Sequence, residues 1–95
     1  MKINAAFGKA LRRVRKTQGL SQEAFGLVSS RTYLSTLERG LKSPTLDKIE
    51  ALASVLNVHP LTLLTLAYQE RQGHANLQIL SERVSKELAS LNRLD

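Results

Sequence analysis

A polar cluster within residues 29–40, SSRTYLSTLERG, carries side chains whose types and spacing suit binding to a charged or polar partner. The guanidinium of Arg31 can donate two parallel hydrogen bonds to a guanine edge, and the hydroxyls of Ser30, Thr32 and Thr36 can meet any base edge. Thr36 follows Thr32 by four residues, which places both on one face of a helix. The pattern fits an α-helix that reads DNA. It equally fits a helix whose polar face meets only water.

The residues around this cluster predict that it is a short helix. Ser30 or Ser29 is a typical N-terminal cap, and Gly40 is a typical stop. Leu34 and Leu37 lie three residues apart and are expected to face a core. The unpaired N–H groups and the positive dipole end at the start of such a helix favour phosphates. A helix held by its two leucines would therefore present its polar side and its start to a partner.

The positive charge of the chain is concentrated in its first half. The 95 residues carry a net charge of +6. Residues 1–48 contain ten Lys and Arg against three Asp and Glu, or +7, whereas residues 49–95 contain four against five, or −1. This asymmetry predicts that the first half meets a polyanion and that the second half has a different role.

Residues suited to catalysis or metal binding are few. The sequence has no cysteine, which excludes disulfides and thiolate metal sites. His59 and His74 have no second ligand close to them in the sequence, and the Ser, His and Asp residues follow no catalytic pattern. The five glycines are scattered as helix punctuation and form no phosphate-binding loop. We therefore predict a protein that is not an enzyme and that needs neither a cofactor nor a metal.

Caps, glycines and apolar spacing predict six helical segments. Their expected bounds are residues 4–18, 22–28, 30–39, 46–57, 60–70 and 76–94. The expected caps are Asn4, Ser21, Ser29 or Ser30, and Thr45, with Pro60 at a first turn, and the expected stops are Gly19, Gly40 and Asn57. The apolar positions expected in the core are Phe7, Ala10, Leu11, Val14, Phe25, Val28, Leu34, Leu37, Leu46, Ile49, Leu52, Ala53 and Leu56.

The last predicted helix follows a polar linker, RQGHAN, which divides the chain into residues 1–70 and residues 71–95. Its apolar side chains recur at spacings of 3, 4, 4, 3 and 3, and they are Leu77, Leu80, Val84, Leu88, Leu91 and Leu94. Such a seam is typical of a helix that packs against another helix. We expect the first five of these residues to form a dimer interface. The alternative is that the helix folds back onto the first and fifth helices of its own chain.

The stretch LSQEAF…SSRTYLSTLERGLKSPTLDKIEALASVLNV resembles the Cro and phage-repressor-like (XRE) helix-turn-helix family. The resemblance covers roughly residues 5–67 and rests on the combination of these segments, because LERG alone is common. It implies an all-α fold, a five-helix lambda-repressor-like DNA-binding bundle, to which the C-terminal amphipathic helix is added. It also implies binding to operator DNA, in most of the family as a symmetric dimer.

The resemblance implies roles for individual residues of this sequence. The positions that match base-reading residues are Ser30, Arg31, Thr32 and Thr36, with Arg31 the first choice for guanine. The positions that match contacts to the DNA backbone are Ser21, Gln22, Tyr33, Arg39, Lys42 and Ser43. Arg15 and Glu38 match a salt bridge that joins the first and third helices, so Glu38 is structural. Two alternatives stay open, because Ser21 also fits a plain helix cap and Tyr33 also fits a partly buried ring that covers the turn.

One segment departs from the family pattern. Between QEAF and RTYLS the family usually has about two more residues, often with a glycine in the turn, whereas this chain has GLVSS with its glycine early, at Gly26. We expect the second helix to end sooner or the turn to be tighter. The tilt of the third helix, and the pairing of its side chains with particular bases, stay open.

These observations lead to one functional hypothesis and one alternative. The hypothesis is a transcriptional regulator, in the first instance a repressor, that binds a palindromic operator as a homodimer; phage-type repressors, restriction-modification controllers and small pathway regulators all fit. The alternative is an antitoxin-like module whose C-terminal helix binds a heterologous protein while the first domain regulates its own promoter. No apolar run approaches the roughly 20 residues of a membrane span, so we expect a cytoplasmic protein of a bacterium or phage with no membrane partner.

Overall fold

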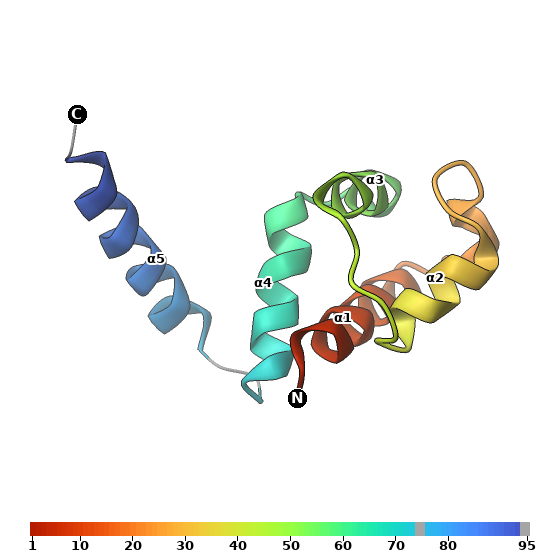
Figure 1. The fold of residues 1–95 in the computed structure, drawn as a ribbon, viewed down its shortest axis with the longest axis horizontal. Helices are drawn as coiled ribbons and strands as arrows, with labels where there is room; N and C mark the ends of the chain where they lie inside the picture. The colour runs from red at the N-terminus through yellow and green to blue at the C-terminus, as the bar shows by residue number, and fades with distance from the viewer. Residues whose placement is uncertain (74–75, 94–95) are drawn as a thin grey trace.

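Every regular element in the described part of the chain, residues 1–73 and 76–93 of the computed structural model, is helical. The elements in chain order are α1 (Ile3–Thr17), the 3-10 helix η1 (Gln22–Phe25), α2 (Arg31–Glu38), α3 (Leu46–Leu56), α4 (Pro60–Arg71) and α5 (Leu77–Asn92). The predicted fold class is confirmed. Five elements, α1 to α4 with η1 among them, form the bundle, and α5 follows as the additional C-terminal helix (Figure 1).

Polar residues cap the start of α2, which carries the polar cluster, and both ends of α3. The Ser30 hydroxyl accepts from the backbone N–H of Tyr33, and the Thr45 hydroxyl accepts from that of Lys48, each at 3.1 Å. Each bond satisfies one of the unpaired donors of a first helical turn. α3 ends at Asn57, whose φ of 55° lies in the left-handed region. The caps and stops predicted at these positions are confirmed.

Two expectations about the first two helices were wrong. α1 begins at Ile3 after Lys2 and therefore includes Asn4, which does not cap it. The second helix does not run through residues 22–28, because only Gln22–Phe25 are helical and they form a 3-10 helix. The expected early end of this helix is confirmed. Gly26 follows with φ of −55°, so it serves no left-handed turn.

The core lies where α1 packs on α4 and where α2 and α3 close the remaining sides. Its fully buried large side chains are Leu11, Phe25, Leu34, Leu37, Leu52, Leu56 and Leu63. Val14 and Val28, both predicted in the core, are half-buried against it. Leu46 was wrongly assigned to the core, because its side chain is 78% exposed. The first three residues of α3 are not buried, and the core begins at Ile49, so the three-residue spacing does not bring Leu46 onto the core.

A glycine sets how closely α1 approaches α2. A Cβ atom at Gly8 would lie 2.3 Å from the carbonyl oxygen of Leu37 and 2.6 Å from that of Glu38. Real Cβ contacts do not occur at such distances, so any side chain here would push the two helices apart. Gly8 is thus a packing residue and not simple punctuation. Its absence of a side chain brings the end of α2 against α1, where Arg15 also lies.

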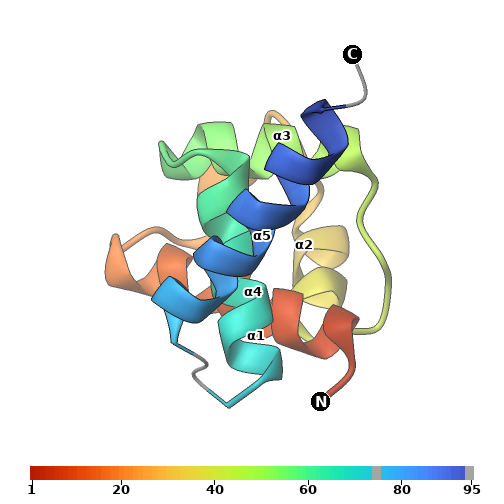
Figure 2. The ribbon, with the colours of Figure 1, turned by 90° about the vertical axis from the view of Figure 1, so that its left-hand side faces the viewer.

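α5 lies beside α4 and away from α1, α2 and α3 (Figures 1 and 2). None of the residues from Leu77 to Asn92 is buried. Leu94, the last member of the predicted seam, lies outside the described residues. Over residues 1–73 and 76–93 no single helix is long and apolar enough to cross a membrane. Taken together, α3 and α4 have the length and composition of a membrane span, but they form a pair bent by 102°.

Candidate nucleic-acid interface

α2 is anchored on one side and open on the other. Leu34 and Leu37 are fully buried in the core, whereas Arg31 and Thr32 in the first turn are exposed. Ser30, the cap, is exposed as well. The helix is therefore fixed in position by its apolar residues, and its N-terminal half is open to a partner. This is the arrangement that a helix entering the major groove requires.

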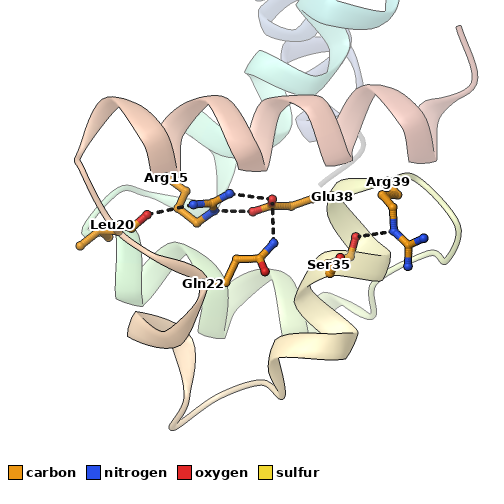
Figure 3. Close-up of polar contacts among 6 residues, drawn as sticks. All are labelled: Arg15, Leu20, Gln22, Ser35, Glu38 and Arg39. Atoms are coloured by element: carbon orange, nitrogen blue, oxygen red, sulfur yellow. Dashed lines mark hydrogen bonds and ion pairs between the residues drawn. The ribbon is translucent and has the colours of Figure 1, made fainter.

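A buried ion pair fixes the orientation of α2 relative to α1. Arg15 Nε lies 2.6 Å from Glu38 Oε2 and Arg15 Nη2 lies 2.9 Å from Glu38 Oε1 (Figure 3). Their side chains are only 10% and 5% exposed. The hydrogen bonds to Glu38 raise the pKa of Arg15 against the opposing effect of its burial. Arg15 also donates to the carbonyl oxygen of Leu20 at 2.9 Å, so the pair holds the chain between α1 and η1 too.

Gln22 belongs to the same network. Its side-chain nitrogen donates to Glu38 Oε1 at 3.2 Å, and the residue is half-buried (Figure 3). The residue assigned by resemblance to a phosphate contact therefore also joins η1 to α2. Ser21, its neighbour, is exposed and makes no cap hydrogen bond among the described residues. Ser21 thus occupies the N-cap position of η1, as the cap alternative predicts, but its hydroxyl does not cap the helix.

Arg31 does not extend freely into solvent. Its Nη1 lies 3.1 Å from Glu23 Oε1 in η1, and the two side chains are 73% and 61% exposed. The pKa of the Glu23 carboxyl is lowered by a hydrogen bond from its own backbone N–H, by the charge of Arg31 and by the hydroxyl of Ser21. Sequence reasoning missed this pair, because the expected α-helix over residues 22–28 gave no reason to bring Glu23 toward the start of α2.

Two side chains on the polar face of α2 bond to their own helix. The Thr36 hydroxyl donates to the carbonyl oxygen of Thr32 at 2.8 Å. Because this bond uses the single hydrogen of the hydroxyl, the Thr36 oxygen is left as an acceptor, which suits the amino groups of adenine or cytosine. Arg39 Nε donates to the carbonyl oxygen of Ser35 at 3.4 Å, while most of its side chain is exposed (Figure 3).

Two lysines lie over the ring of Tyr33. Lys42 Nζ is 6.0 Å and Lys48 Nζ is 5.3 Å from the ring centroid. Tyr33 is half-buried, as the alternative of a ring covering the turn predicts, and a contact of this ring with the DNA backbone stays a prediction. Lys48 also donates to the carbonyl oxygen of Val28, so it closes the turn before α2. Lys48 was missed because it lies in α3, outside the segment whose residues matched the family pattern for DNA contacts.

A hollow between η1 and α2 brings several of the predicted contacts together. Its lining residues are Gln22, Arg31, Thr32, Ser35 and Arg39. Lys42 and Ser43 are exposed in the loop that follows α2. Two predicted base contacts, Arg31 and Thr32, and two predicted backbone contacts, Gln22 and Arg39, thus line one hollow.

A further cluster of charges ties α1 to the end of α4. Glu70 is buried and lies 3.0 Å from Arg13 Nη1 and 3.4 Å from Lys9 Nζ. Sequence reasoning missed this cluster, since Glu70 lies 57 or more residues from its two partners and no local pattern relates them. The single carboxylate of Glu70 offsets one of the two positive charges and links the end of α4 to α1.

The histidines have no metal-binding surroundings in the part of the chain that the structure describes. His59 Nδ1 accepts from the backbone N–H of Leu61 at 2.9 Å and caps α4, next to Pro60 at the first helical position. His74 lies outside the described residues. Among residues 1–73 and 76–93 there is no group of His, Asp or Glu that could hold a metal ion.

α5 presents the predicted seam with little cover from its own chain. Leu77, Val84, Leu88 and Leu91 are exposed, and Leu80 is half-buried. A groove runs between α4 and α5, and its apolar lining residues are Leu61, Leu64, Tyr68, Leu77, Leu80 and Val84. The seam therefore continues onto α4, and the two helices offer one joint apolar surface.

Comparisons with known proteins point in one direction. A helix-turn-helix family model matches residues 11–63. The chain is 40% identical over 65 residues to Control protein C.BamHI of Bacillus amyloliquefaciens, a match that covers 65% of this chain and 80% of that protein. It is 37% identical over 67 residues to the HTH-type transcriptional regulator y4dJ of Sinorhizobium fredii, a match that covers 68% of this chain and 87% of that protein.

Solved structures agree with the sequence matches. The fold is similar to that of the restriction-modification controller protein C.AhdI from Aeromonas hydrophila, with a TM-score of 0.59, 36% identity, and 62% of this chain and 92% of that chain covered. It is also similar to the clp gene regulator ClgR from Corynebacterium glutamicum, with a TM-score of 0.69 and 27% identity. That likeness covers 93% of this chain and 92% of the other, so it includes most of α5.

Proposed function

The chain belongs to the helix-turn-helix family of transcriptional regulators, and we propose that it represses transcription by binding a palindromic operator as a homodimer. It is a DNA-binding regulator and not an enzyme, because the proteins that it matches are control and regulator proteins. The observation that carries the proposal is the position of α2. Two buried leucines and the Arg15–Glu38 pair hold this helix, while its polar first turn is open.

In the proposed complex, α2 enters the major groove with its N-terminal half. Arg31 donates to the O6 and N7 atoms of a guanine, and Ser30, Thr32 and Thr36 meet neighbouring base edges. The contacts to the DNA backbone come from the elements on either side of α2. Ser21 and Gln22 grip one strand, and Tyr33, Arg39, Lys42 and Ser43 grip the flanking phosphates. The exposed Ser21 and the cation pair over Tyr33 support these assignments.

The proposed dimer forms through the joint apolar surface of α4 and α5. Its predicted residues are Leu77, Leu80, Val84, Leu88 and Leu91. The exposure of all of them but the half-buried Leu80 supports this role, because a contiguous apolar surface is unusual on a protein without a partner. A two-fold axis between protomers would set the two α2 helices about 34 Å apart, one turn of DNA, and would require a palindromic site.

The relatives support the controller type of regulator. One is named a control protein, and another is titled a restriction-modification controller. We propose that this chain acts in the same way, in the cytoplasm of a bacterial cell. A second candidate function is favoured by the exposed seam on α5, which could equally bind a heterologous protein in the manner of an antitoxin.

Selection of bound duplexes from a random pool, combined with light scattering, tests the proposal. We expect a palindromic consensus whose half-sites are about 10 base pairs apart, and a mass of two chains without DNA. A pool that shows no enrichment would contradict sequence-specific binding. A single half-site with a monomeric mass would contradict the homodimer and favour the heterologous partner, which is then sought among proteins encoded beside this one.

A further inference from the structure

The Glu23–Arg31 ion pair lies on the face that the proposed function assigns to DNA, where a carboxylate is unexpected. Glu23 follows Ser21 and Gln22, both assigned to phosphate contacts, and its carboxylate is 61% exposed. DNA presents a dense row of negative phosphates to any protein in its groove. A negative side chain at this position therefore opposes binding to every DNA sequence, and it occupies the one arginine assigned to base reading.

Fold stability does not account for the pair. Exposed ion pairs contribute little to folding, because water screens them and two long side chains must be held in one geometry. The connection between η1 and α2 is already made by the buried Glu38, which accepts from both Arg15 and Gln22 (Figure 3). Removing the Glu23 carboxylate would leave these bonds intact. The effect of Glu23 is therefore expected on the binding of DNA.

We propose that Glu23 is a specificity-determining residue that keeps Arg31 from binding phosphates and releases it to guanine. The proposal rests on the proposed function, in which Arg31 reads a base. With its guanidinium 3.1 Å from the Glu23 carboxylate in η1, Arg31 already has an anionic partner and is less available to a passing phosphate. A phosphate that captured Arg31 would leave Glu23 unpaired and close to the DNA backbone, where like charges repel.

A guanine edge competes with Glu23 for the Arg31 guanidinium better than a phosphate does. Its O6 and N7 offer two acceptors in the spacing of the guanidinium fork, and the site lies inside the groove, farther from the phosphates. Arg31 thus exchanges a single exposed carboxylate contact for a bidentate one at the correct base. At other sequences no such exchange is offered, and Arg31 stays with Glu23. The pair weakens binding to all DNA but weakens incorrect binding more.

The test compares Glu23→Gln with a matched control in the full-length chain. Glu87→Gln removes the same charge from the Arg83–Glu87 pair on α5, whose side chains are 77% and 60% exposed. Each protein is titrated by fluorescence anisotropy against the selected operator duplex and against a scrambled duplex of equal length, at several KCl concentrations. Arg31→Ala and the Glu23→Gln, Arg31→Ala double variant complete the set, and thermal unfolding verifies that each protein is folded.

We expect Glu23→Gln to bind the scrambled duplex about eightfold more tightly at 0.1 M salt, the effect of one additional phosphate contact, with a salt slope steeper by about 0.9. Operator binding should strengthen by only about twofold, since Arg31 is engaged with guanine there. The preference for operator would then fall about fourfold. In the Arg31→Ala background, Glu23→Gln should strengthen both duplexes equally, and Glu87→Gln should leave the preference unchanged.

Two outcomes would overturn the proposal and are separable from failure of the proposed function. If Arg31→Ala relaxes one base position while Glu23→Gln leaves the operator preference intact, Arg31 reads DNA but Glu23 does not govern it. If Glu23→Gln has the same effect with and without Arg31, Glu23 acts only as a repelling charge. If Arg31→Ala leaves base preference unchanged, the assignment of Arg31 in the proposed function fails, and the role of Glu23 fails with it.

Discussion

The bundle of α1 to α4 covers its own apolar side chains, whereas α5 leaves its leucines exposed. All of the buried apolar residues lie between Ala6 and Ala67, and none of Leu77–Asn92 is buried. The bundle also satisfies its buried charges internally, with Arg15 against Glu38 and Arg13 against Glu70. The difference favours the prediction that the first part of the chain folds alone and that the second part contacts another chain.

The largest expected effect comes from removing one partner of a buried ion pair inside the bundle. Glu38→Ala leaves the buried Arg15 without its partner, which we expect to lower the free energy of unfolding by about 3–5 kcal/mol. Urea denaturation followed by circular dichroism measures it. Glu50→Ala, an exposed position on α3, is the control and should change stability little. An unchanged midpoint for Glu38→Ala would mean that the pair contributes nothing to holding α1 and α2 together.

The next effect tests the other side of the comparison, the dependence of α5 on a partner. Truncation after Gln72 keeps the whole core, so the bundle should stay folded, but we expect it to be monomeric. Operator affinity should fall about a hundredfold, because the two half-sites no longer act together. Light scattering and anisotropy titration measure the two quantities.

A pair of single variants makes the same test without removing the helix. Leu88→Ser changes a seam residue, whereas Ile79→Ser changes an exposed apolar residue on the far side of α5. Only Leu88→Ser should weaken the dimer. A truncated protein that remains dimeric and binds the palindrome at full affinity would leave α4 and its preceding loop as the interface.

A smaller effect concerns the open face of α2 within the bundle. Arg31→Ala removes the proposed guanine contact and should cost about 1–3 kcal/mol of operator binding while relaxing the requirement at one base pair. Binding to a series of operators, each with one base pair changed, measures this. Arg83→Ala, which removes an exposed arginine from α5, should retain the full base preference.

The smallest effect distinguishes positioning contacts from reading contacts. Lys42→Ala removes one cation beside Tyr33 and should weaken binding to all sequences alike, by about eightfold at 0.1 M salt, with a salt slope shallower by about 0.9. Lys86→Ala removes the same charge from α5 and should leave the slope unchanged. A change in base preference for Lys42→Ala would indicate that Lys42 reads bases rather than positions the protein.

Local sequence signals predicted the elements whose ends depend on nearby atoms. The Ser30 and Thr45 caps and the Asn57 stop were predictable because a hydroxyl meets a backbone N–H only three residues away and a left-handed residue ends a helix by itself. The three-residue spacing of apolar residues likewise identified Leu34 and Leu37 as the buried side of α2. The same argument wrongly placed Leu46 in the core, because periodicity predicts which face of a helix is apolar but not how far along the helix other elements cover that face.

By itself the sequence determined the family, the helical class, the polar face of α2 and the apolar seam of α5, since all of these follow from residue type and spacing along one chain. Only the tertiary structure decided the contacts between distant residues. Gly8 permits the close approach to Leu37, and Glu70 pairs with Lys9 and Arg13, across separations that no local pattern encodes. It also decided that residues 22–25 form a 3-10 helix, and this short turn brings Glu23 to Arg31.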